Sequence, residues 1–138
     1  MLIALISCVA SKSQVAAAAK DMYTSPLFKG AYRYAKKLGA ERIFILSAKY
    51  GLVPDDKVIE PYNETLNTKG VGEIKQWANN VLAELAKVAD LQNDKFIILA
   101  GMKYRKYLVG GIKHFTVPLK GKPIGKQLAF YKGEFPNG

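Results

Sequence analysis

Four continuous apolar runs of strand length divide this chain, and segments with helical periodicity separate most of them. The runs cover residues 2–7, 43–46, 96–100 and 115–117. Such runs are typical of strands buried on both faces of a parallel sheet. Helical spacing of apolar residues predicts helices over 26–38 and 74–88, with shorter ones over 102–108 and 124–131. Strands that alternate with helices predict a three-layer αβα arrangement around a mostly parallel sheet.

The length and the cysteine content limit the class of protein further. With 138 residues, 49% of them hydrophobic, the chain suits one domain over 1–138. No apolar run approaches the roughly 20 residues that cross a bilayer, so we expect no membrane segment. Residues 5–8 superficially resemble a lipoprotein cleavage site, but no positive region precedes them and the apolar run is too short. The single cysteine is compatible with a reducing cytoplasm, where we expect the protein.

The positive charge is concentrated near the C-terminus. The formal net charge is +10, and from residue 99 onward a single acid accompanies eight basic residues: Lys103, Arg105, Lys106, Lys113, Lys120, Lys122, Lys126 and Lys132. Aromatic residues such as Tyr104 and Phe130 lie between them. A basic, aromatic segment could bind a phosphate backbone and stack bases. A solvated lysine-rich surface is the alternative.

Four polar loops follow the four predicted strands. They cover residues 8–12, 47–66, 101–105 and 118–127, and are rich in Gly, Ser, Lys, Tyr or Pro. In open α/β sheets, ligands bind beyond the carboxyl ends of the strands. We therefore expect these loops to meet around one crevice.

The loop at 47–66 carries the best residues for acid-base chemistry. Glu60 and Glu64 flank Pro61-Tyr62, which restricts the local chain, and Lys49 precedes them. Either glutamate could instead cap a helix or pair with Lys49. Asp55 and Asp56, directly after Pro54, favour a solvated turn. Tyr50 and Tyr62 could stack on a base, or could pack against the sheet edge.

The first and last loops carry anion-binding and thiol groups. Cys8, Ser11 and Lys12 offer a thiol, a hydroxyl and a cation, although a packing thiol is the commoner role of a cysteine at a strand end. The loop at 118–127 has two glycines and three lysines that could meet phosphates. Neither a Walker loop nor a dinucleotide-binding fingerprint occurs. One cysteine and one histidine argue against a zinc site, and we expect no metal and no cofactor.

Several short motifs together resemble a bacterial and phage domain family of unknown function. They are Cys8-x-x-Ser11-Lys12, Leu46-Ser47-Ala48-Lys49-Tyr50-Gly51-Leu52, Pro61-Tyr62 with Thr65-Leu66, Gly101-x-x-Tyr104-Arg105, and Pro118-Leu119-x-Gly121-x-x-Ile124-Gly125. That family looks related to the uracil-DNA glycosylase-like fold, to the peroxide-stress protein family and to accessory domains of archaeal transfer-RNA deazaguanine enzymes. The resemblance implies a four-stranded parallel sheet in the order 2-1-3-4, and base or nucleoside chemistry.

The chain also departs from those relatives. A Gly-Gln-Asp-Pro-Tyr-His signature is absent after the first strand, and no His-Pro-Ser motif follows the fourth. Asn63 stands where the family frequently has a carboxylate. The resemblance therefore does not imply ordinary uracil excision, and Glu64 or Glu60 would have to supply the acid.

The leading hypothesis is an enzyme that binds nucleic acid, with DNA favoured over RNA, and acts on an extruded base, which could be a modified one, at its N-glycosidic bond. Glu64, Glu60 and Lys49 would be catalytic. The substrate-binding candidates are Cys8, Ser11, Lys12, Ser47, Tyr50, Gly51, Tyr62, Asn63, Gly101, Tyr104, Arg105, Pro118, Leu119, Gly121, Gly125 and Gln127. The alternatives are a non-catalytic base-binding module, an enzyme acting on free nucleosides or nucleotides, and a stress protein that uses Cys8 as a redox thiol.

Overall fold

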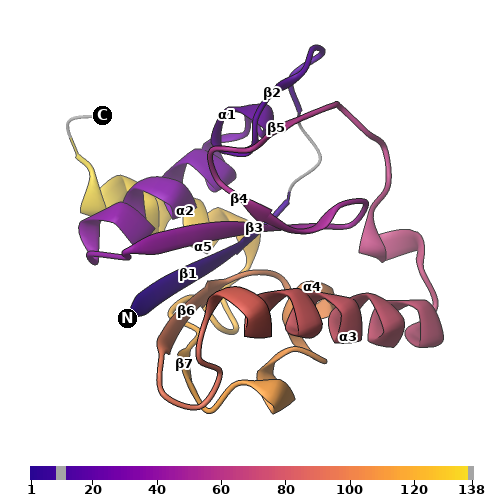
Figure 1. The fold of residues 1–138 in the computed structure, drawn as a ribbon. Helices are drawn as coiled ribbons and strands as arrows, with labels where there is room; N and C mark the ends of the chain where they lie inside the picture. The colour runs from indigo at the N-terminus through magenta and orange to yellow at the C-terminus, as the bar shows by residue number, and fades with distance from the viewer. Residues whose placement is uncertain (9–11, 137–138) are drawn as a thin grey trace.

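A five-stranded sheet forms the centre of the protein in the computed structural model, which describes residues 1–8 and 12–136 (Figure 1). The strand order is β4-β3-β1-β6-β7. The strands are β1 (Leu2–Ser7), β3 (Arg42–Ser47), β4 (Gly51–Pro54), β6 (Lys95–Leu99) and β7 (His114–Thr116). All neighbouring pairs are parallel except β3 and β4, which are antiparallel. The predicted α/β fold with a mostly parallel sheet is confirmed.

The expectation of four strands, all parallel, is wrong because the sheet has a fifth, antiparallel strand at its β3 edge. After β3 the chain reverses within a short turn, and Gly51 takes a φ of +72°, a conformation that favours glycine. Ser47 then pairs with Gly51, and Phe44 with Pro54. Part of the long loop expected at 47–66 is therefore β4.

Helices are present at all four predicted positions, 26–38, 74–88, 102–108 and 124–131, with ends that differ by up to three residues, whereas the short helix at 19–22 was not predicted. They are α1 (Ala19–Met22), α2 (Pro26–Lys37), α3 (Val71–Val88), α4 (Met102–Arg105) and α5 (Ile124–Glu134), with 3-10 turns η1 (Leu66–Thr68) and η2 (Val109–Gly111). Ser25 caps α2, since its Oγ accepts a 3.2 Å hydrogen bond from the backbone N–H of Phe28. Outside the main sheet, β2 (Ala17–Ala18) pairs with β5 (Val58–Ile59).

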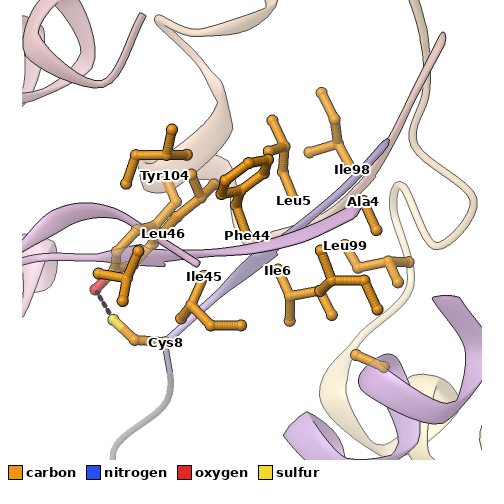
Figure 2. Packing of buried hydrophobic residues seen from close by; sticks show 14 of the residues in the cluster. Ala4, Leu5, Ile6, Cys8, Phe44, Ile45, Leu46, Ile98, Leu99 and Tyr104 are labelled. Atoms are coloured by element: carbon orange, nitrogen blue, oxygen red, sulfur yellow. Dashed lines mark hydrogen bonds between the residues drawn. The ribbon is translucent and has the colours of Figure 1, made fainter. Parts of the chain in front are cut away.

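Helices cover both faces of the sheet. Helix α2 packs against α5 on one side, and α3 lies on the other (Figure 1). The α2–α5 contact is close, because a Cβ atom placed on Gly30 would lie 2.6 Å from Cδ2 of Tyr131. Side chains of the three central strands, such as Leu5, Ile45 and Ile98, are completely buried between these layers (Figure 2).

None of the helices in the described part of the chain is long and apolar enough to cross a membrane.

Candidate functional site

A cavity of about 700 Å³ opens at the carboxyl ends of β1, β6 and β7. Residues from these strand ends form its floor, and the beginnings of α2 and α5 form one wall. Ligand sites in proteins typically enclose about 300–1,000 Å³, so the volume of this cavity lies in the range of small-molecule sites. Open α/β sheets bind ligands at this end of their strands.

The cavity walls are largely apolar, and the charged residues among them are all basic. The apolar side chains include Ile6, Phe28, Leu99, Leu119 and Tyr131. The charged ones are Lys103, Arg105 and Lys122, and the described lining residues include no Asp or Glu. The cavity therefore suits a ligand with an apolar or aromatic part and a negative charge.

A thiol and a phenol meet at a buried part of the cavity wall. Cys8 donates a 3.2 Å hydrogen bond from Sγ to the hydroxyl oxygen of Tyr104 (Figure 2). That oxygen also accepts the backbone N–H of Leu66 at 3.3 Å. Burial raises the pKa of Tyr104 to about 12, so the phenol is neutral at ordinary pH. Trp77, half-buried on α3, packs edge-on against Tyr104 with ring centroids 5.5 Å apart.

Ser47 and Tyr62 lie in a separate, buried hydroxyl cluster. The Tyr62 hydroxyl is 2.5 Å from that of Tyr23, and Ser47 donates to it from Oγ at 2.9 Å. The Ser47 Oγ in turn accepts the backbone N–H of Tyr50 at 3.0 Å. Burial raises the pKa of Tyr62 well above its usual range. These contacts make Ser47 and Tyr62 part of the protein interior.

The two tyrosines expected as stacking platforms contact each other. The ring of Tyr50 meets that of Tyr62 edge-on, with centroids 5.5 Å apart, and Lys12 Nζ lies 4.8 Å from the Tyr62 centroid. Tyr62 is only 8% exposed. A base could stack on Tyr62 only after these neighbours moved.

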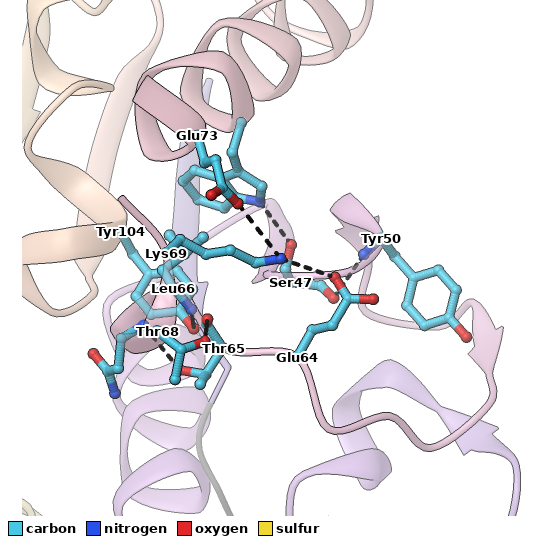
Figure 3. Close-up of polar contacts among 11 residues, drawn as sticks. Ser47, Tyr50, Glu64, Thr65, Leu66, Thr68, Lys69, Glu73 and Tyr104 are labelled. Carbon is cyan, nitrogen blue, oxygen red and sulfur yellow. Dashed lines mark hydrogen bonds and ion pairs between the residues drawn. The ribbon is translucent and has the colours of Figure 1, made fainter. Parts of the chain in front are cut away.

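The candidate catalytic groups lie outside the cavity lining. Glu64 is about half exposed and pairs with Lys69 at 3.8 Å, while Lys69 is also 3.9 Å from Glu73 (Figure 3). Glu60 is exposed, and its backbone oxygen accepts a 3.3 Å hydrogen bond from the Tyr50 hydroxyl. Lys49 is exposed, with Nζ 5.2 Å from the Tyr50 ring centroid.

The structure brings fewer than half of the predicted site residues together around the cavity. Those that line it are Cys8, Gly101, Tyr104, Arg105, Leu119, Gly121 and Gln127. Those that do not are Lys12, Ser47, Lys49, Tyr50, Gly51, Glu60, Tyr62, Asn63, Glu64, Pro118 and Gly125. Ser11 lies outside the described residues.

Sequence reasoning missed the α2 wall of the cavity and Asn67. Ser25 to Phe28 and Asn67 line the cavity but were not site candidates, whereas Lys103 and Lys122 were expected only as members of the basic segment that could meet phosphates. The α2 wall had a usable signal, because a helix that follows a parallel strand begins at the carboxyl edge of the sheet. Within the described residues, no group of three or more His, Cys, Asp and Glu side chains is arranged to hold a metal ion.

The fold and the cavity define an α/β protein with a ligand-sized site at the carboxyl ends of a mostly parallel sheet. The chain belongs to a family of unknown function, DUF6884, whose family model matches residues 3–133. A search of curated proteins finds no match to the chain.

Proposed function

We propose that this protein binds nucleic acid and accepts the base of an extruded nucleotide in the cavity between β1, β6, α2 and α5. The cavity itself carries the proposal, since it combines apolar walls for a planar ring with a mouth whose charged residues are all basic. The basic C-terminal segment would contact the flanking phosphates. Its exposed lysines Lys106, Lys120 and Lys126 lie close in sequence to residues that line the cavity. We propose DNA rather than RNA as the nucleic acid because of the sequence resemblance.

The proposal includes kinship with the uracil-DNA glycosylase-like fold. The short motifs that carry the resemblance support it. When the antiparallel strand β4 is set aside, the remaining parallel strands have the order β3-β1-β6-β7, which is compatible with that kinship. The kinship concerns architecture, and it does not name a base or a reaction.

Hydrolysis of the N-glycosidic bond is the second candidate function. Glu64 lies three residues before Asn67, which lines the cavity, and the carboxylate of Glu64 is about half exposed with one long ion pair. A carboxylate beside the sugar would stabilise the developing oxocarbenium charge. Because the described lining residues include no carboxylate, this reaction requires the segment at 60–67 to move toward the bound nucleotide.

Binding and base placement are tested with a variant that fills the cavity. Gly101 lines it, and a Cβ atom there would meet nothing within 4 Å, so Gly101→Leu should fold normally while occupying ligand space. Gly110→Leu is the matched control, since Gly110 is equally open but outside the lining. DNA affinity is measured by fluorescence anisotropy over a salt series, and base placement by the emission of 2-aminopurine in the DNA.

The native protein and Gly110→Leu should bind DNA with steep salt dependence and change the 2-aminopurine emission. Gly101→Leu should keep the salt-dependent binding and lose the emission change. Equal emission changes in both variants would contradict placement of the base in this cavity. Base release is measured separately on DNA with natural and modified bases, and a rate unchanged in the Glu60→Gln/Glu64→Gln double variant would remove these carboxylates from the reaction.

A further inference from the structure

Two of the cations at the cavity mouth have their charged heads fixed on its wall. Lys103 donates from Nζ to the backbone oxygen of Asn67 at 3.1 Å, and Arg105 donates from Nη1 to that of Ala100 at 2.8 Å. Asn67 and Ala100 are themselves lining residues. The backbone carbonyls therefore hold both charges beside the space that a ligand would fill.

Both heads keep donors for a ligand. An ammonium has three N–H donors and a guanidinium five, so one hydrogen bond each leaves two on Lys103 and four on Arg105. In the described part of the chain, neither side chain forms an ion pair with a carboxylate within 4 Å. A negatively charged ligand would thus be their first ionic partner.

A third cation enters the mouth from the turn before α5. Gly121, with a φ of +78°, allows the tight turn, and the backbone N–H of Lys122 bonds to the oxygen of Leu119 at 3.0 Å. Gln127 donates from Nε2 to the Lys122 backbone oxygen at 2.8 Å. The backbone that carries Lys122 is therefore held in place, whereas its side chain stays exposed.

Three basic residues without an acid exceed what an internal phosphate of a nucleic acid strand requires. A phosphodiester carries one negative charge, whereas a terminal phosphate carries about 1.5 to 2 near neutral pH and has three acceptor oxygens. We infer that the cavity takes a nucleotide with a terminal phosphate monoester, which Lys103, Arg105 and Lys122 hold at the mouth while the base occupies the apolar interior. This inference rests on the proposed function for the position of the base.

Two kinds of ligand carry a nucleotide with a terminal phosphate, a free nucleoside monophosphate and a phosphorylated strand end. Calorimetric titration can distinguish them. The first series compares nucleosides, their 5′-monophosphates and the corresponding methyl phosphodiesters. The second compares short single strands with a 5′-phosphate or a 5′-hydroxyl. Lys103→Gln and Lys122→Gln test the site. Lys57→Gln and Lys87→Gln are matched controls with the same charge change, because both lysines are exposed and lie outside the cavity lining and outside the basic C-terminal segment.

The monophosphate should bind at least tenfold more tightly than the nucleoside and several-fold more tightly than the diester. Lys103→Gln and Lys122→Gln should each weaken monophosphate binding by about tenfold, as expected for a lost charge-assisted hydrogen bond. The two controls should stay within twofold of the native protein. Affinity for the phosphorylated strand that exceeds affinity for the free monophosphate would identify a strand end as the source.

The phosphate inference and the proposed function fail in different ways. Equal affinity for monophosphate and diester, or equal losses in the controls, overturns the terminal-phosphate site. If a 5′-hydroxyl strand still binds and its 2-aminopurine emission still responds to Gly101→Leu, the proposed function stands without that site. If inorganic phosphate binds as tightly as the monophosphate and depends equally on Lys103, the phosphate site stands and the base placement falls.

Discussion

The substitution Tyr62→Phe removes one buried hydroxyl while keeping the ring that was expected to stack on a base. The lost oxygen lies 2.5 Å from the Tyr23 hydroxyl and accepts from Ser47 Oγ at 2.9 Å. Two hydrogen bonds at roughly 0.5–1.5 kcal/mol each give a loss of about 2 kcal/mol. The Tyr23 side chain is 1% exposed, so the loss of its Tyr62 partner in this buried setting adds about 1–2 kcal/mol.

We therefore expect Tyr62→Phe to lower the free energy of unfolding by about 3–4 kcal/mol. Urea denaturation followed by far-ultraviolet circular dichroism measures this value. Tyr50→Phe is the matched control, because the Tyr50 hydroxyl makes a single 3.3 Å bond at the surface and should contribute less than about 0.5 kcal/mol. Adding Ser47→Ala to Tyr62→Phe should cost less than the sum of the two single changes, since both remove the same hydrogen bond.

A loss in Tyr62→Phe no larger than in Tyr50→Phe would refute the buried hydroxyl cluster as a stabilising element. In that case stacking on a base would again be the expected role of Tyr62. The substitution distinguishes these roles because phenylalanine preserves a π-face for stacking and abolishes only the hydroxyl contacts.

Two further predictions concern the packing of the interior. Burial raises the pKa of Tyr23 and of Tyr104 to about 12 from an ordinary value near 10, so these phenols lose their protons in the unfolded chain before they do so in the folded protein. Their contribution to stability should be constant below about pH 10 and should be lost between about pH 10 and 12. A urea midpoint that does not fall over this interval would contradict the raised pKa values. Gly30→Ala places Cβ 2.6 Å from Tyr131, which should cost about 1–3 kcal/mol of stability, partly offset by a helix-propensity gain of about 1 kcal/mol. In Gly72→Ala the added Cβ meets nothing within 4 Å, so this variant should only gain stability. Equal stabilities of the two variants, measured by urea denaturation, would be inconsistent with the close α2–α5 contact.

Most of the fold could be predicted because buried strands and amphipathic helices leave periodic patterns. The first strand coincides with the predicted range 2–7, and β3 extends the predicted 43–46 by one residue at each end. Strand β4 was missed because Gly51 and Pro54 at its ends are typical of loops. The adjacent, buried Leu52 and Val53 were its only apolar signal, and two residues are too few to show a period.

The site was harder to predict because the same residue types serve packing and binding. Tyr62 is buried by Tyr23, which is 39 residues away in sequence, and no local pattern shows that pairing. Glu64 forms an ion pair with Lys69 at the surface, a contact that the sequence allowed but did not require. The topological argument was more useful, since the edge at the carboxyl ends of the strands does contain the cavity.

The structure assigns different consequences to substitutions in two parts of the predicted site. Ser47 and Tyr62 are buried and hydrogen-bonded, so their loss should first reduce stability, and any loss of binding should follow the unfolded fraction. Gly101, Lys103 and Lys122 are exposed on the cavity, so their loss should reduce binding at unchanged stability. A plot of binding against stability for both sets of variants therefore locates the site, whichever ligand is used. Two separate trends would place the site in the cavity. Binding losses at full stability in Ser47 or Tyr62 variants would instead place the site in the loop between β3 and η1.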